Sequence, residues 1–375
     1  MASPAARKPT PTSAPGSAMP DQPEGVKAGK SSPAQSRSRE CQYQCQRQCG
    51  MAVVSALLIV AVIAVLAASL LGRQSAFIRT TQGEQFRAQA RWLLRGEVNE
   101  AQRTLRAEAV REPTTRLDGL WNRPVLRQGA GQVAADGGRL VSEISDEQGK
   151  FNLRNLVDRG RIDPLEAGVF TRLCALVGVP APVAKSVMRR VAVSLGDVSD
   201  LGDVGAQAEG AAPDAAREPS ARAAESLGLP ADLPRTAQAP RLRALEDLLA
   251  VPGVDAGVLA RLMPFVTVLP ERTWINANTA SAEVVAAGVE GLSLDKARAL
   301  LVARDKGQWF INRGDFANRL RMPEQDVSEV RMGVTSNWFR VASVLDTART
   351  KYVQAALLHD DKTTLPRVVW LREGV

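Results

Sequence analysis

The stretch QRQCGMAVVSALLIVAVIAVLAASLLGRQ, Gln46 to Gln74, decides the fold of this 375-residue chain. From Met51 to Leu71 it contains 21 consecutive residues without a charge. As a helix they would span about 32 Å, which matches the roughly 30 Å hydrocarbon core of a bilayer. A secretory signal has a shorter apolar region, about 7–15 residues long, although the small residues Ala67–Ser69 would suit a signal peptidase. The stretch therefore predicts a transmembrane helix, with a cleaved signal as the alternative.

The charge distribution gives this helix a direction. Five basic residues precede the apolar run closely: Lys27, Lys30, Arg37, Arg39 and Arg47. By the positive-inside rule the N-terminus lies in the cytoplasm and the bulk of the chain outside it. Half of the net charge of +8 lies in residues 1–50, and the other 325 residues carry 41 positive and 37 negative groups. Such a thin excess is not the concentrated basic surface of a nucleic-acid-binding protein, so no nucleic-acid partner is expected.

The four cysteines divide into two groups. Cys41, Cys45 and Cys49 recur every four residues before the apolar run, which would place three thiols on one face of a helix. Zinc sites use tighter pairs and a fourth ligand, and a reduced cytosolic leader explains the same residues. Cys174 lies among apolar residues at helical spacing, and we expect it in a core.

Helical periodicity continues beyond the apolar run, with no proline from Arg73 until Pro113. Apolar residues recur there at three- and four-residue steps: Phe86, Ala90, Leu93, Leu94, Val98, Ala101 and Leu105. This spacing makes an amphipathic stripe. The sequence predicts a single helix from about Met51 to about Val110, apolar in its first half and half-buried in its second.

A basic leader ending in Gly, followed by an apolar helix that continues into an amphipathic one, resembles the start of a type IV pilin-like protein. The resemblance implies that a prepilin peptidase cuts after Gly50 and methylates the new N-terminus, Met51. Most members of that class carry Glu at the fifth mature position, where this chain has Ser55. Such a Glu is thought to neutralise the N-terminal ammonium of a neighbouring subunit, and burying it without a partner is costly. Ser55 therefore fits a tip subunit, which has no neighbour ahead of it.

The stretch RLVSEISDEQGKFNL, Arg139–Leu153, predicts two short strands joined as a hairpin by the turn Asp146–Gly149. Within it, SDEQGKFNLRNL resembles a recurring stretch of the type II secretion system minor pseudopilin K family. That family usually continues with D-W-I-D-x-D, whereas SLGDVSDLGD here keeps Asp197, Asp200 and Asp203 without the Trp. Three carboxylates in a Gly-containing loop are suitable Ca²⁺ ligands, but solvated loops carry the same residues. Calcium is therefore one of two interpretations, and no other cofactor is expected.

Two segments similar to helix-hairpin-helix modules of DNA-uptake and repair proteins follow, turning at Pro252-Gly253 and at Gly288–Gly291. Those modules hold phosphate with backbone N–H groups and nearby Lys or Arg. Asp255 and Glu290 at these turns would oppose a phosphate. The nearby basic residues are typical of the solvated face of a helix: Lys296, Arg298, Arg304 and Lys306. A membrane-anchored DNA receptor is the alternative function.

The chain ends in three strand-like runs, SNWFRVASVLD, TKYVQAALLHD and LPRVVWLRE. The predicted fold is α+β: a pilin-like long N-terminal helix packed on an antiparallel β-sheet, with a large all-α, helix-hairpin-helix-like domain inserted in the sheet. The expected parts are a leader removed by prepilin peptidase (1–50), a transmembrane helix (51–72), its periplasmic continuation (73–112), a first β part (113–155), the inserted helical domain (156–334, with an Ala- and Pro-rich flexible loop at 204–240) and a second β part (335–375).

The resemblance implies a minor pseudopilin at the tip of the type II secretion pseudopilus, which nucleates its assembly for protein export across the outer membrane. It implies a single pass through the bacterial inner membrane with a periplasmic C-terminal domain. The implied partners are the I-, J- and H-type minor pseudopilins, the major pseudopilin, the prepilin peptidase and the inner-membrane secretion platform. The residues indicate no enzyme, because the sequence has no phosphate-binding Gly loop, no nucleophile elbow and only one histidine, His359.

Overall fold

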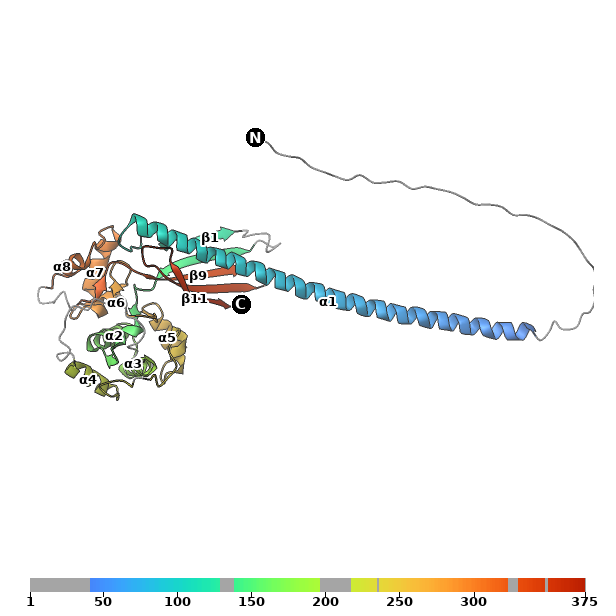
Figure 1. Ribbon diagram of the computed structural model, residues 1–375, viewed down its shortest axis with the longest axis horizontal. Coiled ribbons are helices and arrows are strands. Elements are labelled where there is room, and N and C mark those ends of the chain that lie inside the picture. Colours follow the sequence, from blue (N-terminus) through green and yellow to red (C-terminus); the bar gives the residue numbers. More distant parts are fainter. Residues whose placement is uncertain are drawn as a thin grey trace, which may run out of the picture. The chain divides into compact units, whose positions relative to one another are not determined.

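The computed structural model describes residues 41–128, 138–195, 217–234, 236–322, 330–347 and 350–374, with the backbone alone for 41–50. The chain divides into two compact units, Met1–Ile78 and Arg79–Val375. The leader up to residue 40 lies outside the described residues. The fold is α+β, as the sequence predicts: a long helix, an antiparallel sheet and a set of shorter helices (Figure 1).

The first element is α1, Cys41–Arg111, a single helix of 71 residues. It ends two residues before Pro113, because the residue before a proline is disfavoured in helical conformation. From Met51 to Leu71 every side chain is exposed, and this part is long and apolar enough to cross a membrane. The predicted continuous helix is therefore confirmed.

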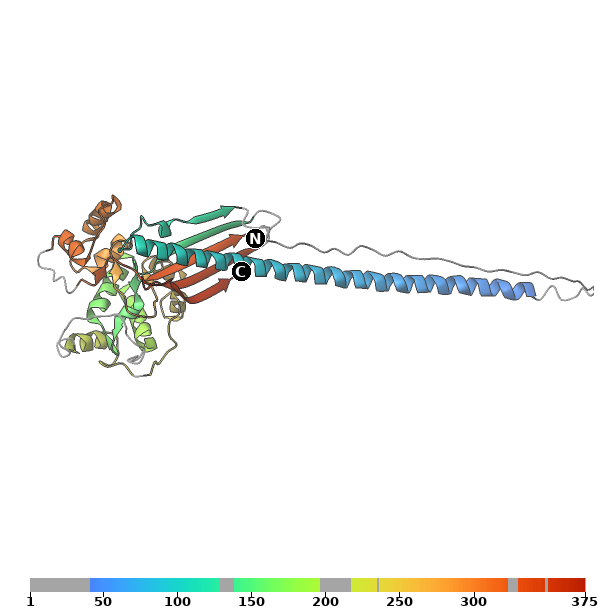
Figure 2. The ribbon, with the colours of Figure 1, turned by 45° about the horizontal axis from the view of Figure 1, so that its top comes forward.

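The sheet has five antiparallel strands in the order β1-β2-β9-β10-β11. Their bounds are β1 Val125–Gln128, β2 Arg139–Asp146, β9 Trp338–Asp346, β10 Lys351–His359 and β11 Arg367–Gly374. Two strands come from before the helical domain and three from after it, and the β2–β9 pair joins them. The sheet is thus continuous in space although the sequence interrupts it (Figure 2).

The predicted stripe of α1 packs on this sheet. Its buried members are Ala90, Leu94, Val98, Ala101 and Leu105, each at most 4% exposed. They form two apolar clusters. Ala90 and Leu94 pack with Leu140 and Leu345, whereas Val98 and the residues beyond it pack with Phe339 and its neighbours. The amphipathic half of α1 is therefore held by the face of the sheet.

A polar row crosses the sheet between these two clusters. Ser142, Ser343 and Gln354 are direct neighbours on β2, β9 and β10, and all three are buried. The two serine hydroxyls share a hydrogen bond of 2.9 Å. Neither amide atom of Gln354 has a hydrogen-bond partner among the described residues. The contact between α1 and the sheet therefore consists of two apolar halves with a polar line between them.

The inserted domain contains short helices and short strand pairs. Its helices are α2 Pro164–Leu176, α3 Ala181–Leu195, α4 Arg217–Ser226, η3 Leu245–Ala250, α5 Ala256–Leu262, α6 Ala282–Gly288, α7 Leu294–Asp305 and α8 Arg313–Leu320. Its small strands are β3 Phe151–Asn152, β4 Val157–Asp158, β5 Arg161–Ile162, β6 Val266–Thr267, β7 Ile275–Asn276 and β8 Met332–Gly333. The 3₁₀ turns η1, Leu120–Asn122, and η2, Leu153–Leu156, complete the described elements.

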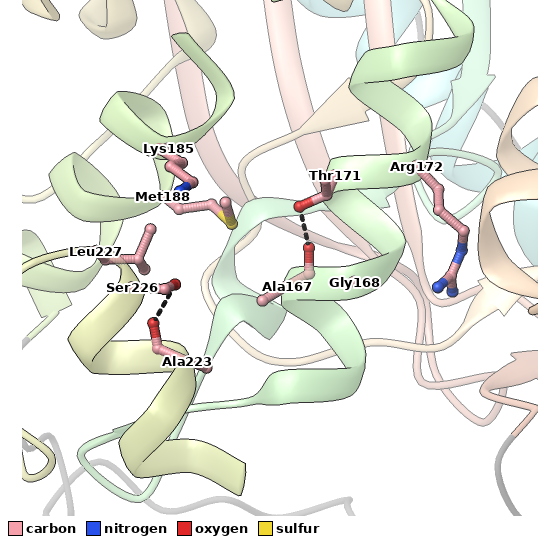
Figure 3. Close-up of a pocket in the computed structure, with 9 residues that line it drawn as sticks. All are labelled: Ala167, Gly168, Thr171, Arg172, Lys185, Met188, Ala223, Ser226 and Leu227. Carbon is pink, nitrogen blue, oxygen red and sulfur yellow. Dashed lines mark hydrogen bonds between the residues drawn. The ribbon is translucent and has the colours of Figure 1, made fainter. Parts of the chain in front are cut away.

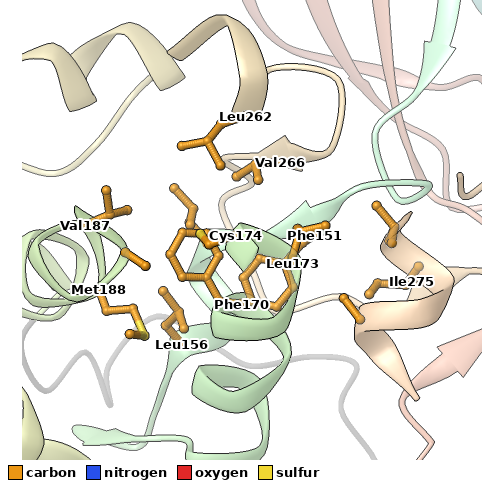
Figure 4. Packing of buried hydrophobic residues seen from close by; sticks show 14 of the residues in the cluster. Phe151, Leu156, Phe170, Leu173, Cys174, Val187, Met188, Leu262, Val266 and Ile275 are labelled. Atoms are coloured by element: carbon orange, nitrogen blue, oxygen red, sulfur yellow. The ribbon is translucent and has the colours of Figure 1, made fainter. Parts of the chain in front are cut away.

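One core holds this domain together (Figure 4). Phe151 and Phe170 lie with ring centroids 5.5 Å apart, and Leu173 and Cys174 pack beside them on α2. Helix α2 begins with Asp163 as N-cap, whose carboxylate accepts from two backbone N–H groups, followed by a proline at the first helical position. Cys174 is 1% exposed, as expected for a core residue.

Two expectations about local structure are wrong. Residues Arg139–Leu153 do not form a hairpin, because β2 already has β1 and β9 on its two edges and β3 pairs in parallel with β6 instead. The first β part of the sheet therefore ends at Asp146 rather than at residue 155. Within the expected loop 204–240, residues 217–226 form α4 with Ala224 fully buried. Alanine is the strongest helix former, so an Ala-rich segment is not by itself a loop signal.

Candidate functional site

The predicted processing residues lie in the exposed first half of α1. The Gly50–Met51 junction is inside the helix, and Met51 is 74% exposed. Ser55 donates its hydroxyl to the carbonyl oxygen of Ala52 at 3.0 Å. The serine is thus satisfied by its own helix, whereas a carboxylate at this position would require a partner from elsewhere.

No metal site is visible in the part of the chain that the structure describes, where no three His, Cys, Asp or Glu side chains are grouped to hold an ion. Asp197, Asp200 and Asp203 lie outside the described residues, so calcium binding there stays a prediction. Burial raises the pKa of the Cys174 thiol to about 12. A thiol with so high a pKa is not a nucleophile at neutral pH.

The second hairpin, between α6 and α7, uses its basic residues within the fold. Arg304 is 4% exposed and donates to the carbonyl oxygens of Ala277 and Ala280, at 3.0 and 2.7 Å. The expectation that Arg304 lies on a solvated face is therefore wrong: its guanidinium satisfies buried backbone acceptors, which would otherwise be left unpaired. Lys296 and Lys306 are exposed, as expected.

The turn of this hairpin also carries charge pairs. Arg298 lies 3.7 Å from Glu283 and 3.5 Å from Asp295. Glu290, at the turn itself, is exposed and lies 3.8 Å from Arg172 of α2. Arg298 is thus flanked by acids and the turn presents a carboxylate. A carboxylate at the turn opposes the phosphate that such a module would hold there.

A buried polar cluster lies where the sheet joins the helical domain, and it is centred on Asp146. This carboxylate is 8% exposed. It accepts from Ser336 Oγ at 2.5 Å, Thr279 Oγ1 at 2.5 Å and Asn276 Nδ2 at 3.2 Å, and from the backbone N–H of Gln148 at 2.8 Å. Burial raises the pKa of Asp146, and the hydrogen bonds oppose the rise. This carboxylate thus connects the end of β2 to the helical domain, through Asn276 and Thr279, and to the segment that leads into β9, through Ser336.

Gln148 connects the same parts through its amide. Its Oε1 accepts from the backbone N–H groups of Asn337 and Trp338, at 2.6 and 3.2 Å, and its Nε2 donates to the carbonyl oxygen of Trp274 at 3.1 Å. Gly149 approaches Thr279 so closely that a Cβ would lie 2.9 Å from its Oγ1. The stretch Asp146–Gly149 is therefore the joint between sheet and helical domain, not the tip of a hairpin.

Sequence reasoning missed this joint because its partners lie far along the chain. Asn276, Thr279 and Ser336 follow Asp146 by 130 to 190 positions. The available signal was the run of polar residues directly after a strand, since buried polar groups must find partners.

A second buried charge cluster fixes the start of α2. Asp163 receives hydrogen bonds from Arg272, at 2.7 Å, and from Arg331. Arg331 also donates to Glu166 at 3.2 Å. Burial, and then the charge of Asp163, raise the pKa of Glu166 to about 7 against the opposing effect of the two arginines. Although burial opposes it, the arginines hold the pKa of Asp163 below its usual value.

A cavity of about 340 Å³ lies between α2, α3 and α4 (Figure 3). Its polar groups are largely occupied: Thr171 donates to the carbonyl of Ala167 and Ser226 to that of Ala223. Arg172 turns away from the other labelled residues. No carboxylate, histidine or cysteine is among the described residues that line it. The charged side chains on its lining are Lys185 and Arg172.

These features define a class of protein: a pilin-like helix, exposed and apolar at one end and packed on an antiparallel sheet at the other, with a helical domain inserted between two central strands. Two family models described as type II secretion system (T2SS), protein K match residues 149–271 and 275–335. Together they cover the inserted domain, from the joint at Gly149 to the residue before Ser336. The chain belongs to the type II secretion system protein K family, which confirms the resemblance found in the sequence.

Curated proteins named type II secretion system protein K match most of this chain. Type II secretion system protein K of Pseudomonas aeruginosa is 29% identical over 331 residues, covering 86% of this chain and 92% of the relative. The protein of Klebsiella pneumoniae is 27% identical over 343 residues, with 88% and 97% covered. Members of this family are minor pseudopilins, which are structural components of the secretion apparatus.

A solved structure shares the fold. One chain of the crystal structure of the GspK-GspI-GspJ complex from the enterotoxigenic Escherichia coli type 2 secretion system matches with a TM-score of 0.56 at 20% identity. The match covers 79% of this chain and 99% of that chain. At this identity the likeness shows the fold alone.

Proposed function

We propose that this protein stands at the tip of the type II secretion pseudopilus and nucleates its assembly for protein export across the outer membrane. The carrying observation is where the helical domain joins the sheet. It enters after Asp146 and leaves before Trp338, at the end of the sheet that packs on the last turns of α1. A bulky domain beside the last turns of α1 would block another subunit from stacking above it.

The anchor and its direction complete the proposal. The apolar part of α1 spans the inner membrane, with the basic N-terminus in the cytoplasm and the sheet and helical domain in the periplasm. A prepilin peptidase cuts after Gly50 and methylates Met51. The partners are the I- and J-type minor pseudopilins, then the H-type and the major pseudopilin, with the inner-membrane secretion platform below. That the structural neighbour was solved in a complex with GspI and GspJ supports this choice. The role is one of assembly, without catalysis.

The first experiment is the intact mass and N-terminal sequence of the membrane-extracted protein, with and without a co-expressed prepilin peptidase. A mature chain that begins at N-methylated Met51 is the expected result, and Gly50→Leu should abolish it. A chain that keeps residues 1–50 in both cases would make α1 a plain anchor. A cut near Ser69 would make the protein secreted and contradict the proposal.

A second experiment tests the tip position. Replacing residues 148–336 by a short turn would join β2 directly to β9, because Asp146 and Phe339 already pair across the two strands. This variant should enter the shaft with other subunits above it, which site-specific crosslinking to the major pseudopilin measures. If the variant stays at the tip and secretion is unchanged, the helical domain does not set the position.

A further inference from the structure

The cavity between α2, α3 and α4 opens to solvent and has no part in the proposed function (Figure 3). Its volume of about 340 Å³ lies at the lower end of the roughly 300–1,000 Å³ that small-ligand sites occupy. Two of its lining residues, Thr171 and Lys185, are exposed, so a ligand can enter from solvent. The cavity therefore has room for a small molecule or for the end of a chain, and not for a folded element.

The floor of the cavity is apolar. Met188 of α3 and Leu227, which follows α4, are 5% and 7% exposed, and both belong to the core of the helical domain. Ala167 and Ala223 lie on the same lining with side chains of a single carbon. The small residues leave the space open, and the long ones close it off below. An aliphatic group placed there would leave water for an apolar surface, which is favourable.

Two hydroxyls on the lining can accept hydrogen bonds from a ligand. Thr171 donates its hydrogen to the carbonyl oxygen of Ala167 at 2.7 Å, and Ser226 donates to that of Ala223 at 2.8 Å. A hydroxyl has one hydrogen and two acceptor lone pairs. Because both hydrogens are used within the helices, a ligand that bonds to these oxygens must be the donor, as an N–H group is.

Of the two cations on the described lining, Lys185 is the one available to a ligand. Arg172 donates to the carbonyl oxygen of Ala287 at 2.9 Å, and Figure 3 shows it turned away from the cavity. Lys185 lies beside Met188 in the same view, and none of the described carboxylates forms an ion pair with it. Arg189 follows one turn later on α3 and is also exposed. With no acid on the lining, the cavity favours a negatively charged group.

The apolar floor, the acceptor hydroxyls and the cation together select one kind of chemical group. An aliphatic body, an N–H donor and a carboxylate occur together in the last residue of a polypeptide chain. A free amino acid has the same parts, but its nitrogen carries a positive charge, which Lys185 and Arg189 would repel. In a chain end that nitrogen is an uncharged amide, and the open mouth of the cavity lets the rest of the chain continue into solvent.

We propose that the cavity binds the carboxyl end of a polypeptide whose last residue is aliphatic. Lys185 pairs with the carboxylate, a hydroxyl of the lining accepts from the last N–H, and the aliphatic side chain contacts Met188 and Leu227. The site thus recognises the terminus of a partner and not its interior. This assignment does not depend on a position at the tip of the pseudopilus.

The test uses the full-length chain in mild detergent and a fluorescein-labelled hexapeptide, Gly-Ser-Gly-Ser-Gly-Leu, with detergent alone as the blank. Fluorescence anisotropy measures the affinity of this peptide with a free carboxylate and as the C-terminal amide. In the wild type the carboxylate form should bind about fivefold more tightly, as for a solvent-exposed ion pair. In Lys185→Gln this ratio should fall to about one, because the variant removes the same pair. Lys296→Gln changes an exposed lysine of α7 and should keep the wild-type ratio.

The apolar floor is tested separately. A hexapeptide that ends in glycine should bind the wild type about tenfold more weakly, and Ala223→Leu, which fills the cavity, should weaken the leucine peptide by a similar factor. Melting temperatures verify that the variants are folded. Free leucine should not compete with the peptide.

Three outcomes would overturn the proposal. The first is that the leucine peptide shows no saturable binding to the wild type. The second is that the ratio between carboxylate and amide forms is the same in Lys185→Gln as in the wild type. The third is that free leucine competes as well as the unlabelled peptide does, which would assign the cavity to a free amino acid instead of a chain end.

Discussion

Ser336 donates its hydroxyl to the carboxylate of Asp146 at 2.5 Å, across 190 positions of sequence. The two residues lie where the chain leaves the sheet for the helical domain and where it returns. Their contact therefore closes the base of the inserted domain, and Asn276 and Thr279 complete the closure from inside that domain. A domain fastened at its base in this way follows the sheet as a rigid attachment rather than as a tethered one.

Asp146→Ala should destabilise the protein strongly. It removes a buried acceptor and takes from the hydroxyls of Thr279 and Ser336 their 2.5 Å hydrogen bonds, at a cost of about 3 kcal/mol in the free energy of unfolding. Asn276 loses one of its three hydrogen bonds and keeps those to Thr115 and Ser336. Denaturant unfolding of the detergent-solubilised chain measures it. Asp146→Asn keeps the shape and part of the acceptor capacity, so its effect should be smaller. Equal stability of Asp146→Ala and the wild type would show that the cluster does not fasten the domain.

Glu166 should make stability depend on pH. Its pKa in the folded protein, about 7, lies above the usual 4.5, so between these values the folded state holds a proton that the unfolded chain has released. Stability should therefore fall as the pH rises from about 4.5 through 7, by up to about 3 kcal/mol. Asp163 acts in the opposite direction at lower pH, because its pKa is lowered: its contribution is lost as the pH falls below its usual 3.8.

Glu166→Gln should flatten this decline, so that the variant gains stability relative to the wild type at about pH 8 compared with about pH 5. Thermal unfolding across that range measures it. The control is Glu143→Gln, which changes an exposed carboxylate on β2. A decline that persists unchanged in Glu166→Gln would assign the pH dependence to other groups.

Gln354→Leu should stabilise the protein. Gln354 is 1% exposed and neither of its amide atoms has a hydrogen-bond partner among the described residues. Burying such a group costs about 1–3 kcal/mol, and leucine has a similar size without that cost. The free energy of unfolding should rise by about 1 kcal/mol, measured against Gln85→Leu on the exposed face of α1. A loss of stability would mean that water or another group satisfies the amide.

Substitutions of Arg304 and Arg298 should differ sharply in their effect on stability although both residues lie on α7. Arg304→Ala leaves two buried carbonyl oxygens, those of Ala277 and Ala280, without their donor, and should cost about 2–3 kcal/mol. Arg298→Ala removes only exposed charge pairs and should change stability by less than about 0.5 kcal/mol. Equal effects of the two variants in denaturant unfolding would contradict the structural role given to Arg304.

Local periodicity accounts for the parts of the fold that were predicted correctly. The stripe from Ala90 to Leu105 required only that one helix continue, and the apolar run before it required only length. The wrong predictions concern residues whose hydrogen-bond partners are distant in the sequence. Nothing in the sequence around Asp146 indicates that it contacts Asn276 or Ser336, and the local pattern alone predicts a hairpin. Arg304 was misplaced for the same reason, since an exposed and a buried arginine look alike until the acceptors are known.

The interruption of the sheet has a consequence for folding. Strand β2 can reach its neighbour β9 only after the whole helical domain has been made, and β9, β10 and β11 are the last strands of the chain. Contacts of such long sequence separation form slowly. The helical domain, with a core largely of its own, can fold while α1 still lacks most of the sheet that covers its stripe. A chain shortened before β9 would therefore keep a nearly complete helical domain and leave the apolar stripe of α1, from Ala90 to Leu105, exposed to solvent.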